Sequence, residues 1–264
     1  MDNKITKQRL SNHLEYDWLL YLLIVLVGIF GTYFLFAQIN RTRDYEDVTL
    51  FVSCYDESTH NFVGQTLAHM NASEYQATQR QLYGDNILRS LTVEAWDPIG
   101  NGEYYTLLQT RGTILSDILV VGKSVMPSCI GTFVPLTDEL LNDYLLPDEV
   151  DVKGNPTGKK LKIEDFDYYT VELENGETRR YGLKISSFPQ MHGVGHVFEM
   201  DWRNIESYAA LYGEAAEEYQ PDDEFYICLN SRSENIGKFG KKSKDKNAQA
   251  LYVFNRFLTY YYRI

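Results

Sequence analysis

A long uncharged stretch near the start of the chain constrains the protein more than any other feature. Residues 16–39 read YDWLLYLLIVLVGIFGTYFLFAQI, and no charged side chain follows Asp17 until Arg41. As a helix, the segment from Trp18 to Ile39 would span about 33 Å at roughly 1.5 Å per residue, which matches a hydrocarbon core of about 30 Å. Such a stretch is a membrane anchor, a cleaved secretion signal or a buried core helix.

Its length and pattern favour a permanent anchor. A signal peptide has an apolar region of only about 7–15 residues and then a small-residue cleavage site, whereas this run is longer and ends in FLFAQ without an A-x-A pattern. A buried soluble helix would carry a polar stripe, and this segment is apolar all round. Trp18, Tyr21 and Tyr33 lie near its ends, where aromatic rings favour the membrane interface. We therefore predict one transmembrane helix over 18–39, in contact with membrane lipid.

Basic residues on either side of this helix indicate its orientation. Lys4, Lys7 and Arg9 precede it, and Arg41 and Arg43 follow it. Because basic residues favour the cytoplasmic side, the balance of three to two places the amino terminus inside. The prediction is a single-pass protein of the cell membrane with an extracytoplasmic C-terminal domain.

Beyond the helix, strand-like and helix-like segments alternate. The run DILVV at 117–121 is apolar on both faces, which fits a strand covered by helices on both sides. Strands separated by helices predict an α/β fold with a mainly parallel sheet. Other β-rich runs lie at 48–55, 91–96 and 224–230, and helical patterns lie at 57–70, 74–90, 104–110, 125–130, 135–145, 205–219 and 247–262.

Local signals add detail to this pattern. Residues 168–183 (YYTVELENGETRRYGL) predict a β-hairpin. Asn175-Gly176 suits a two-residue type I′ turn, because both central positions of that turn need a positive φ. Thr137 is predicted to cap the helix at 135–145, and residues 186–204 read as irregular.

The charge balance excludes one class of partner. The chain has 25 Lys and Arg against 37 Asp and Glu, a net charge of −12, whereas a nucleic-acid-binding protein needs a basic face. We therefore expect no nucleic acid partner. The five lysines within Lys238–Lys246 (KFGKKSKDK) are a local exception, which reads as a solvated loop or as a contact for phosphate or lipid.

The sequence shows no catalytic or metal-binding signature. Glycine-rich phosphate loops, GxSxG and HExxH do not occur. His192 and His196 have i,i+4 spacing, but the glycines between them favour a loop over a metal site. We therefore expect no enzyme activity, no metal and no cofactor. Adjacent acidic residues that are typical of solvated loops and helix starts occur at Asp56/Glu57, Asp138/Glu139 and Asp222/Asp223/Glu224.

The three cysteines, Cys54, Cys129 and Cys228, do not form a disulfide framework. Their spacing fits no metal-binding pattern. They read as small buried hydrophobic residues, or as one disulfide and a free thiol.

A candidate ligand site follows from the predicted sheet, because open parallel sheets bind ligands beyond the carboxyl ends of their strands. Aromatic rings can cover the C–H surfaces of a sugar or other polyol, and carboxylates accept its O–H donors. The same side chains could instead only close loops. The candidates that follow the first three strands are Tyr55, Asp56, Trp96, Asp97 and Ser124, and Trp202 in the irregular segment is expected to close over them.

Several segments together resemble the extracellular solute-binding proteins of bacterial sugar ABC transporters. They are TRGTILSDILVVGKS (110–124), FVPLTDELL (133–141), YGLKIS (181–186), and ICLNSRSENIGKF (227–239) followed by NAQALYVFNRFL (247–258). The uncharged stretch followed by RTRDYEDVTLFV (41–52) is similar to small, membrane-anchored relatives of these proteins. The resemblance covers most of residues 45–262.

This resemblance implies a two-lobed, periplasmic-binding-protein-like fold that closes around its ligand by hinge motion. Only about 70 residues lie between Leu145 and Asp222, so the second lobe is expected to be reduced. The implied parts are a cytoplasmic arm (1–17), the transmembrane helix (18–39), a spacer (40–47), an α/β lobe (48–147), a reduced second lobe with the hairpin (148–222), and a return strand with a C-terminal helix that packs on the first lobe (223–264).

The function implied by the resemblance is a membrane-tethered component that delivers a carbohydrate to the permease subunits of an ABC transporter, with no chemistry of its own. Tethering would raise its local concentration at the permease. The alternative is an accessory or interaction subunit that keeps the fold and has lost ligand binding. A glycoside hydrolase is the enzyme alternative, and it lacks a recognisable pair of catalytic carboxylates.

Overall fold

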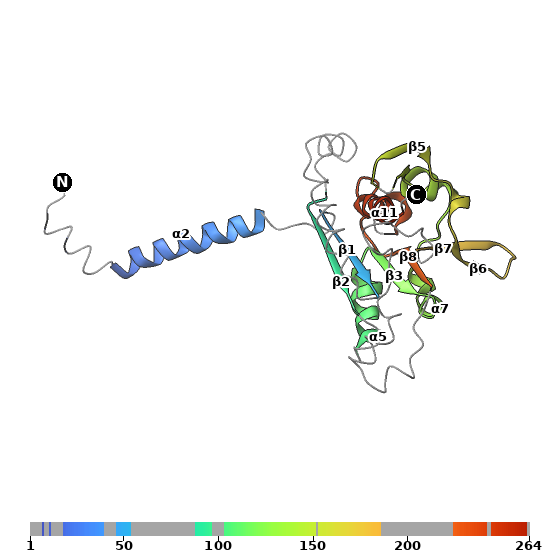
Figure 1. The fold of residues 1–264 in the computed structure, drawn as a ribbon. Coiled ribbons are helices and arrows are strands. Elements are labelled where there is room, and N and C mark those ends of the chain that lie inside the picture. Colours follow the sequence, from blue (N-terminus) through green and yellow to red (C-terminus); the bar gives the residue numbers. More distant parts are fainter. Residues whose placement is uncertain are drawn as a thin grey trace, which may run out of the picture. The chain divides into compact units, whose positions relative to one another are not determined.

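The structure is a computed structural model, and it describes residues 7, 11, 18–39, 46–53, 88–96, 103–151, 153–185, 224–241 and 244–262. The chain forms two compact units, residues 1–42 and residues 43–264 (Figure 1). The helical patterns at 57–70 and 205–219, most of the pattern at 74–90 and the irregular segment 186–204 lie outside the described residues.

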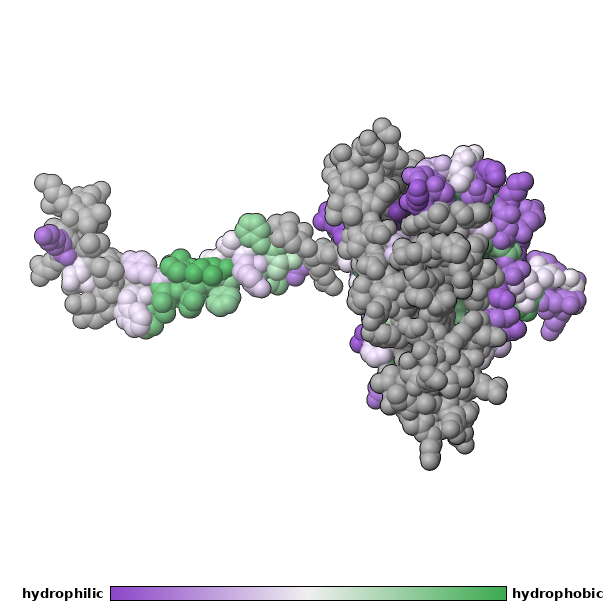
Figure 2. Space-filling view, viewed as in Figure 1, coloured by the Kyte–Doolittle hydropathy of each residue, from purple (hydrophilic) through white to green (hydrophobic). Residues whose placement is uncertain are grey.

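The first unit contains a single described helix of several turns, α2 (Trp18–Ile39), whose bounds agree with the sequence prediction. Figure 2 shows hydrophobic side chains along the face of this helix that is in view, and its large apolar residues are exposed. The segment Trp18–Gln38 is long and apolar enough to cross a membrane, although a signal sequence near the amino terminus meets the same criterion of length and composition. One apolar N-terminal helix is therefore confirmed.

The second unit is an α/β domain built on a six-stranded sheet of order β2-β1-β3-β8-β7-β6. The sheet is mixed rather than mainly parallel, because β1 pairs in parallel with β2 and β3 whereas β8, β7 and β6 continue it in antiparallel pairs. The α/β class is confirmed. The strands are β1 (Asp47–Val52), β2 (Ser90–Ala95), β3 (Ile118–Gly122), β6 (Tyr168–Glu172), β7 (Thr178–Lys184) and β8 (Phe225–Leu229).

Helical segments connect these strands. A continuous helical stretch comprises α5 (Tyr104–Leu107), the π-helical η2 (Leu108–Gly112) and α6 (Thr113–Leu115). The long C-terminal helix is α11 (Gln249–Tyr261). The shorter ones are α7 (Met126–Cys129), η3 (Ile130–Thr132), α8 (Asp138–Leu140), the π-helical η4 (Leu141–Leu145), η5 (Ile163–Asp165) and η7 (Gly237–Phe239).

Two hydrophobic cores cover the two faces of the sheet. Alternate strand residues such as Leu50 and Ile118 pack with Phe254 of α11 on one face. Their neighbours Phe51 and Leu119 pack on the other face, in the core that contains Tyr104 of α5 and Met126 of α7. Because successive strand side chains point to opposite faces, the domain has helix, sheet and helix layers (Figure 1). This arrangement explains why β3 and β8 read as continuous apolar runs.

The hairpin β6–β7 forms where the sequence predicts it, but with a different turn. Leu173 N–H donates to Glu177 O at 2.8 Å, and Gly176 N–H donates to Leu173 O at 2.8 Å. These bonds enclose a three-residue loop, 174–176, in which Gly176 has φ 79°. The prediction of a two-residue type I′ turn is therefore wrong, because the glycine takes the left-handed position of a longer hairpin loop.

Two other local features are notable. The predicted cap is confirmed, since the side chain of Thr137 accepts a hydrogen bond from Leu140 N–H at 3.2 Å. The segment after η4, which the sequence shows only as a break in the pattern, forms a separate antiparallel ribbon of β4 (Asp148–Val150) and β5 (Pro156–Lys160). The exposed residues of β5 gave no alternating signal.

Candidate functional site

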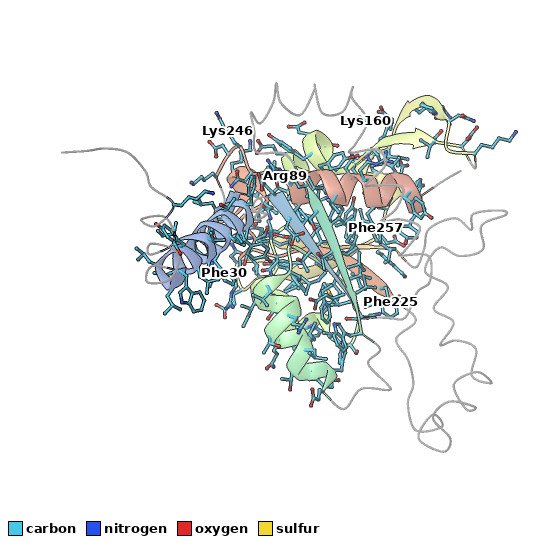
Figure 3. All side chains as sticks on the ribbon, turned by 90° about the vertical axis from the view of Figure 1, so that its left-hand side faces the viewer. Phe30, Arg89, Lys160, Phe225, Lys246 and Phe257 are labelled. Atoms are coloured by element: carbon cyan, nitrogen blue, oxygen red, sulfur yellow. The ribbon has the colours of Figure 1, made fainter. Side chains whose placement is uncertain are left out.

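Five strands meet at one end of the sheet, which we call the carboxyl edge. The parallel strands β2, β1 and β3 end there in register, with Val52 opposite both Ala95 and Val120. β7 also ends at this edge and β8 begins there, since Ile185 N–H donates to Phe225 O at 2.9 Å. In Figure 3, Phe225 marks this edge and Arg89, which precedes β2, marks the opposite end.

An ionic cluster joins three of these strand ends. The carboxylate of Glu224, directly before β8, lies 2.7 Å from Lys123 Nζ and 2.9 Å from Lys184 Nζ. Tyr226 donates its hydroxyl to the same carboxylate at 3.0 Å. Hydrogen bonds from Lys123 and then Lys184 lower the pKa of Glu224 to about 2. The carboxylate therefore stays ionised at neutral pH and fixes the two lysines at the carboxyl edge.

The phenol of Tyr226 completes this cluster on its buried side. Burial, followed by the hydrogen bond to Glu224, raises the pKa of Tyr226 above its ordinary value. Its ring contacts that of Tyr169 in an edge-to-face arrangement, with centroids 5.5 Å apart. Tyr226 is thus a neutral donor that supports Glu224.

A second polar pair lies beneath the ends of the parallel strands. Tyr104 donates its hydroxyl to Ser53 Oγ at 2.7 Å, and both residues are buried. The backbone N–H of Trp96 donates to Val52 O at 2.9 Å, which continues the β1–β2 ladder. The indole of Trp96 packs against the core that contains Phe51, and its N–H is buried without a hydrogen-bond partner among the described residues.

The structure places two of the six predicted site residues. Trp96 is half-buried at the end of β2, and Ser124 is exposed in the turn after β3. Both belong to the carboxyl edge, because β2 and β3 flank β1 there. The other four, Tyr55, Asp56, Asp97 and Trp202, lie outside the described residues.

Sequence reasoning missed Lys184 and the Ser53–Tyr104 pair, and it treated Glu224 only as part of an acidic run. Lys184 and Glu224 lie on either side of the segment 186–223, and only the pairing of β7 with β8 brings them together. A usable signal was present only for Glu224, a charged residue directly before the apolar strand β8, because the strand that ends in Lys184 also carries Arg179 and Arg180.

Polar groups at the opposite end of the sheet, which we call the amino edge, form a buried network. Asp117 accepts hydrogen bonds from Ser233 Oγ at 2.5 Å, from Asn235 Nδ2 at 3.1 Å and from Thr49 N–H at 2.9 Å. Burial raises the pKa of Asp117 to about 6, and the three donors counteract that effect only in part. This network attaches the loop after β8 to the start of β3.

Asn230 closes the same edge from the end of β8. Its Nδ2 lies 2.7 Å from Ser116 O, 3.0 Å from Thr113 O and 3.4 Å from Gly112 O, and its side chain is fully buried. One amide thus binds carbonyl groups at the end of the helical stretch that begins with α5. Such groups lack partners within the helix itself, so we assign Asn230 a structural role.

The remaining reactive residues do not form a chemical site in the described part of the chain. Cys129 and Cys228 are free and buried, and burial raises the pKa of both thiols. This confirms the buried reading for these two cysteines, whereas Cys54 and the pair His192 and His196 lie outside the described residues. No group of three or more His, Cys, Asp or Glu that could hold a metal occurs among the described residues.

The predicted acidic pair Asp138/Glu139 also has a structural role at the surface. Arg180 binds Asp138 and Lys238 binds Glu139. Both carboxylates are exposed and lie in the first turn of α8, where acidic side chains favour helix formation.

No family model matches the chain, and no curated protein or solved structure matches it either. The solute-binding interpretation therefore stays a prediction from the sequence, to be weighed against the geometry of the carboxyl edge.

Proposed function

We propose that this protein is a membrane-tethered, extracytoplasmic, solute-binding-like component of a sugar ABC transporter, with no chemistry of its own. The proposal assigns α2 to the cell membrane as a single-pass anchor and residues 43–264 to the outer side. Its ligand is a carbohydrate or similar polyol, bound at the carboxyl edge.

The observation that supports the ligand site best is the convergence of strand ends at the carboxyl edge. Three adjacent parallel strands end there, which is where ligands bind in open α/β sheets. Trp96 supplies an aromatic surface and Ser124 a hydroxyl, while Lys123 and Glu224 supply a fixed donor and acceptor. These groups suit a ligand that offers both C–H surfaces and hydroxyls.

The buried network at the amino edge joins two of the segments on which the resemblance rests. Asp117 belongs to the segment TRGTILSDILVVGKS, and Asn230 and Ser233 belong to ICLNSRSENIGKF. The two segments contact each other through Asp117 and Asn230. The two segments therefore form one structural unit.

Calorimetric titration of the full chain in lipid nanodiscs with a panel of mono- and disaccharides tests the proposal. We expect one class of sugar to bind, and Trp96→Phe to weaken binding by roughly tenfold, because a smaller ring covers less of the sugar. Trp18→Phe, in α2, is the matched control and should leave the affinity unchanged. Binding of no sugar by the wild type, or equal affinity in both variants, would refute the ligand site.

The anchor has a separate test. Alkaline carbonate washing should leave the protein in the membrane pellet, because a transmembrane helix is not released by disrupting surface contacts. Recovery of the mature protein from the medium without its first forty or so residues would instead identify α2 as a cleaved signal.

An accessory subunit without a ligand is the second candidate. Three exposed apolar residues on the helical stretch that begins with α5 favour it, since Tyr105 and Leu115 are each 68% exposed and Ile114 is 50% exposed. In that case the full chain should bind no sugar and should copurify with a permease, and Leu115→Ser should reduce the amount of permease recovered.

A further inference from the structure

The loop between β8 and α11 presents several basic side chains at the amino edge. Its described basic residues are all exposed, in contrast to the buried Ser233, Asn235 and Asn247 of the same loop. They outnumber its two exposed acids, Glu234 and Asp245, in a chain whose net charge is −12. The exposed basic residues are Arg232, Lys238, Lys241, Lys244 and Lys246, which we call the basic loop.

Hydrogen bonds fix this loop against the start of β1. Asn235 Nδ2 donates to Asp47 O at 3.0 Å. Within the loop, Gly237 N–H donates to Asn247 O at 2.8 Å and Asn247 N–H donates to Lys244 O at 2.8 Å. The exposed lysines are therefore held at one end of the domain. In Figure 3, Lys246 and Lys160 of β5 lie on opposite sides of Arg89.

The chain itself limits how far this end of the domain can be from a membrane that contains α2. Only residues 40–46 separate the end of α2 from the start of β1. At about 3.5 Å per residue, the extended link reaches roughly 28 Å. A domain on so short a tether meets the bilayer surface at a high effective concentration, and the part of it nearest the tether includes the amino edge.

We propose that the basic loop binds the anionic phospholipid head groups of the membrane in which α2 is anchored. The inference rests on the tether of the proposed function and adds to it a lipid partner and a defined orientation of the domain. Ammonium groups on an exposed loop attract lipid phosphates within about one Debye length, roughly 8 Å at physiological salt, and each basic residue near the surface contributes roughly a fivefold gain in binding. With the amino edge on the membrane, the carboxyl edge would face away from it.

The basic residues of the loop are not equivalent in this role. Lys238 binds Glu139 and lies over the rings of Tyr144 and Phe239, at 5.7 Å and 5.3 Å from their centroids, so it is engaged within the domain. Lys241, Lys244 and Lys246 are therefore the expected lipid contacts. Lys153 and Lys159, in and near the β4–β5 ribbon, are exposed as well and serve as internal controls.

Acetylation of individual lysines, followed by mass spectrometry, tests the proposal on the full chain in nanodiscs. Discs of phosphatidylcholine alone are compared with discs that also contain phosphatidylglycerol, at low and high salt. We expect acetylation of Lys241, Lys244 and Lys246 to slow by roughly three- to fivefold in the anionic discs at low salt, and Lys153 and Lys159 to react at the same rate in both. A further sample of neutral discs with inorganic phosphate separates the lipid surface from free phosphate.

A paired substitution sharpens the result. In K241Q/K244Q, Lys246 should lose its lipid-dependent slowing, whereas in K153Q/K159Q it should keep it. The proposal is overturned if the loop lysines react equally in both kinds of disc, if the control lysines slow by the same factor, or if inorganic phosphate alone reproduces the effect. Failure of the tether would be seen separately, because a protein without a stable anchor would not elute with the discs.

Discussion

Asp117 and Glu224 are both carboxylates held by several donors, but they lie at opposite ends of one sheet and differ in almost every other respect. Asp117 is buried, receives neutral donors and has a raised pKa. Glu224 is partly exposed, receives two ammonium groups and has a lowered pKa. Both are fixed by their neighbours, but only Glu224 keeps its charge in contact with solvent.

This difference separates stability from binding. Burial makes a hydrogen bond costly to lose, because an unpaired polar group in the interior is not rescued by water. The amino edge therefore closes the fold, while its exposed lysines are available to the membrane. The carboxyl edge holds charged groups at the surface, where they can exchange partners with a ligand.

The strongest test of this comparison is Asn230→Ala. The substitution removes the donor shared by Ser116 O and Thr113 O in a fully buried position. We expect the free energy of unfolding to fall by about 3 kcal/mol, measured by urea denaturation of the full chain in detergent with circular dichroism. Asn155→Ala, at an exposed turn, is the control and should change it by less than about 0.5 kcal/mol.

Two serines at opposite edges give a matched pair. Ser233 Oγ donates to Asp117 at 2.5 Å and accepts from Asn235 N–H at 2.9 Å, so Ser233→Ala should cost about 2 kcal/mol. Ser124 is exposed, and Ser124→Ala should cost less than about 0.5 kcal/mol. Similar losses in urea denaturation would remove the distinction between the two edges.

The pH dependence of Asp117 provides a third test. Its folded pKa of about 6 exceeds the ordinary value of 3.8, so the folded state takes up a proton first as the pH falls. The stability from this group is present at low pH and is lost as the pH rises through about 6. On going from pH 7 to pH 5 the wild type should gain about 1 kcal/mol from Asp117, and Asp117→Asn should lack this gain in urea denaturation at the two pH values.

Glu224 should respond in the opposite direction and more weakly. Its folded pKa, about 2, lies below the ordinary 4.5, so its contribution is present above pH 4.5 and is lost as the pH falls toward 2. Because the cluster is partly exposed and screened by solvent, we expect only about 0.5 kcal/mol. The difference in stability between wild type and Glu224→Gln should therefore shrink as the pH is lowered from 5 to 3. A difference that grew instead would contradict the assigned ion pairs.

Local sequence signals were sufficient for most of the described elements. The β-rich runs at 48–55, 91–96 and 117–121 each overlap a strand, and the uncharged stretch forms one helix. Thr137 could be identified as a cap because its bond to Leu140 spans only three residues. Such features depend on neighbours in the sequence, and patterns report them directly.

The parts that the sequence did not predict depend on distant residues. Predicting the antiparallel pairing of β8 with β3 requires knowing that residues 225–229 lie beside residues 118–122 in the folded chain. The cluster of Lys123, Lys184 and Glu224 requires the same pairing, because none of the three is near another in the chain. At the candidate site, the sequence could select strand ends such as Trp96 and Ser124 but not the ionic cluster at the ends of β3, β8 and β7.

The hydrogen bond between Ile185 and Phe225 has a consequence for how this chain can change over time. β7 and β8, which this bond joins, are neighbours in the sheet although residues 186–223 separate them in the sequence. The entropic cost of closing a flexible connection grows only slowly with its length, by about 0.6 kcal/mol for each doubling. Changes of length within 186–223 should therefore add little to the entropic cost of closing this connection, so homologues should differ there in length while keeping both strands.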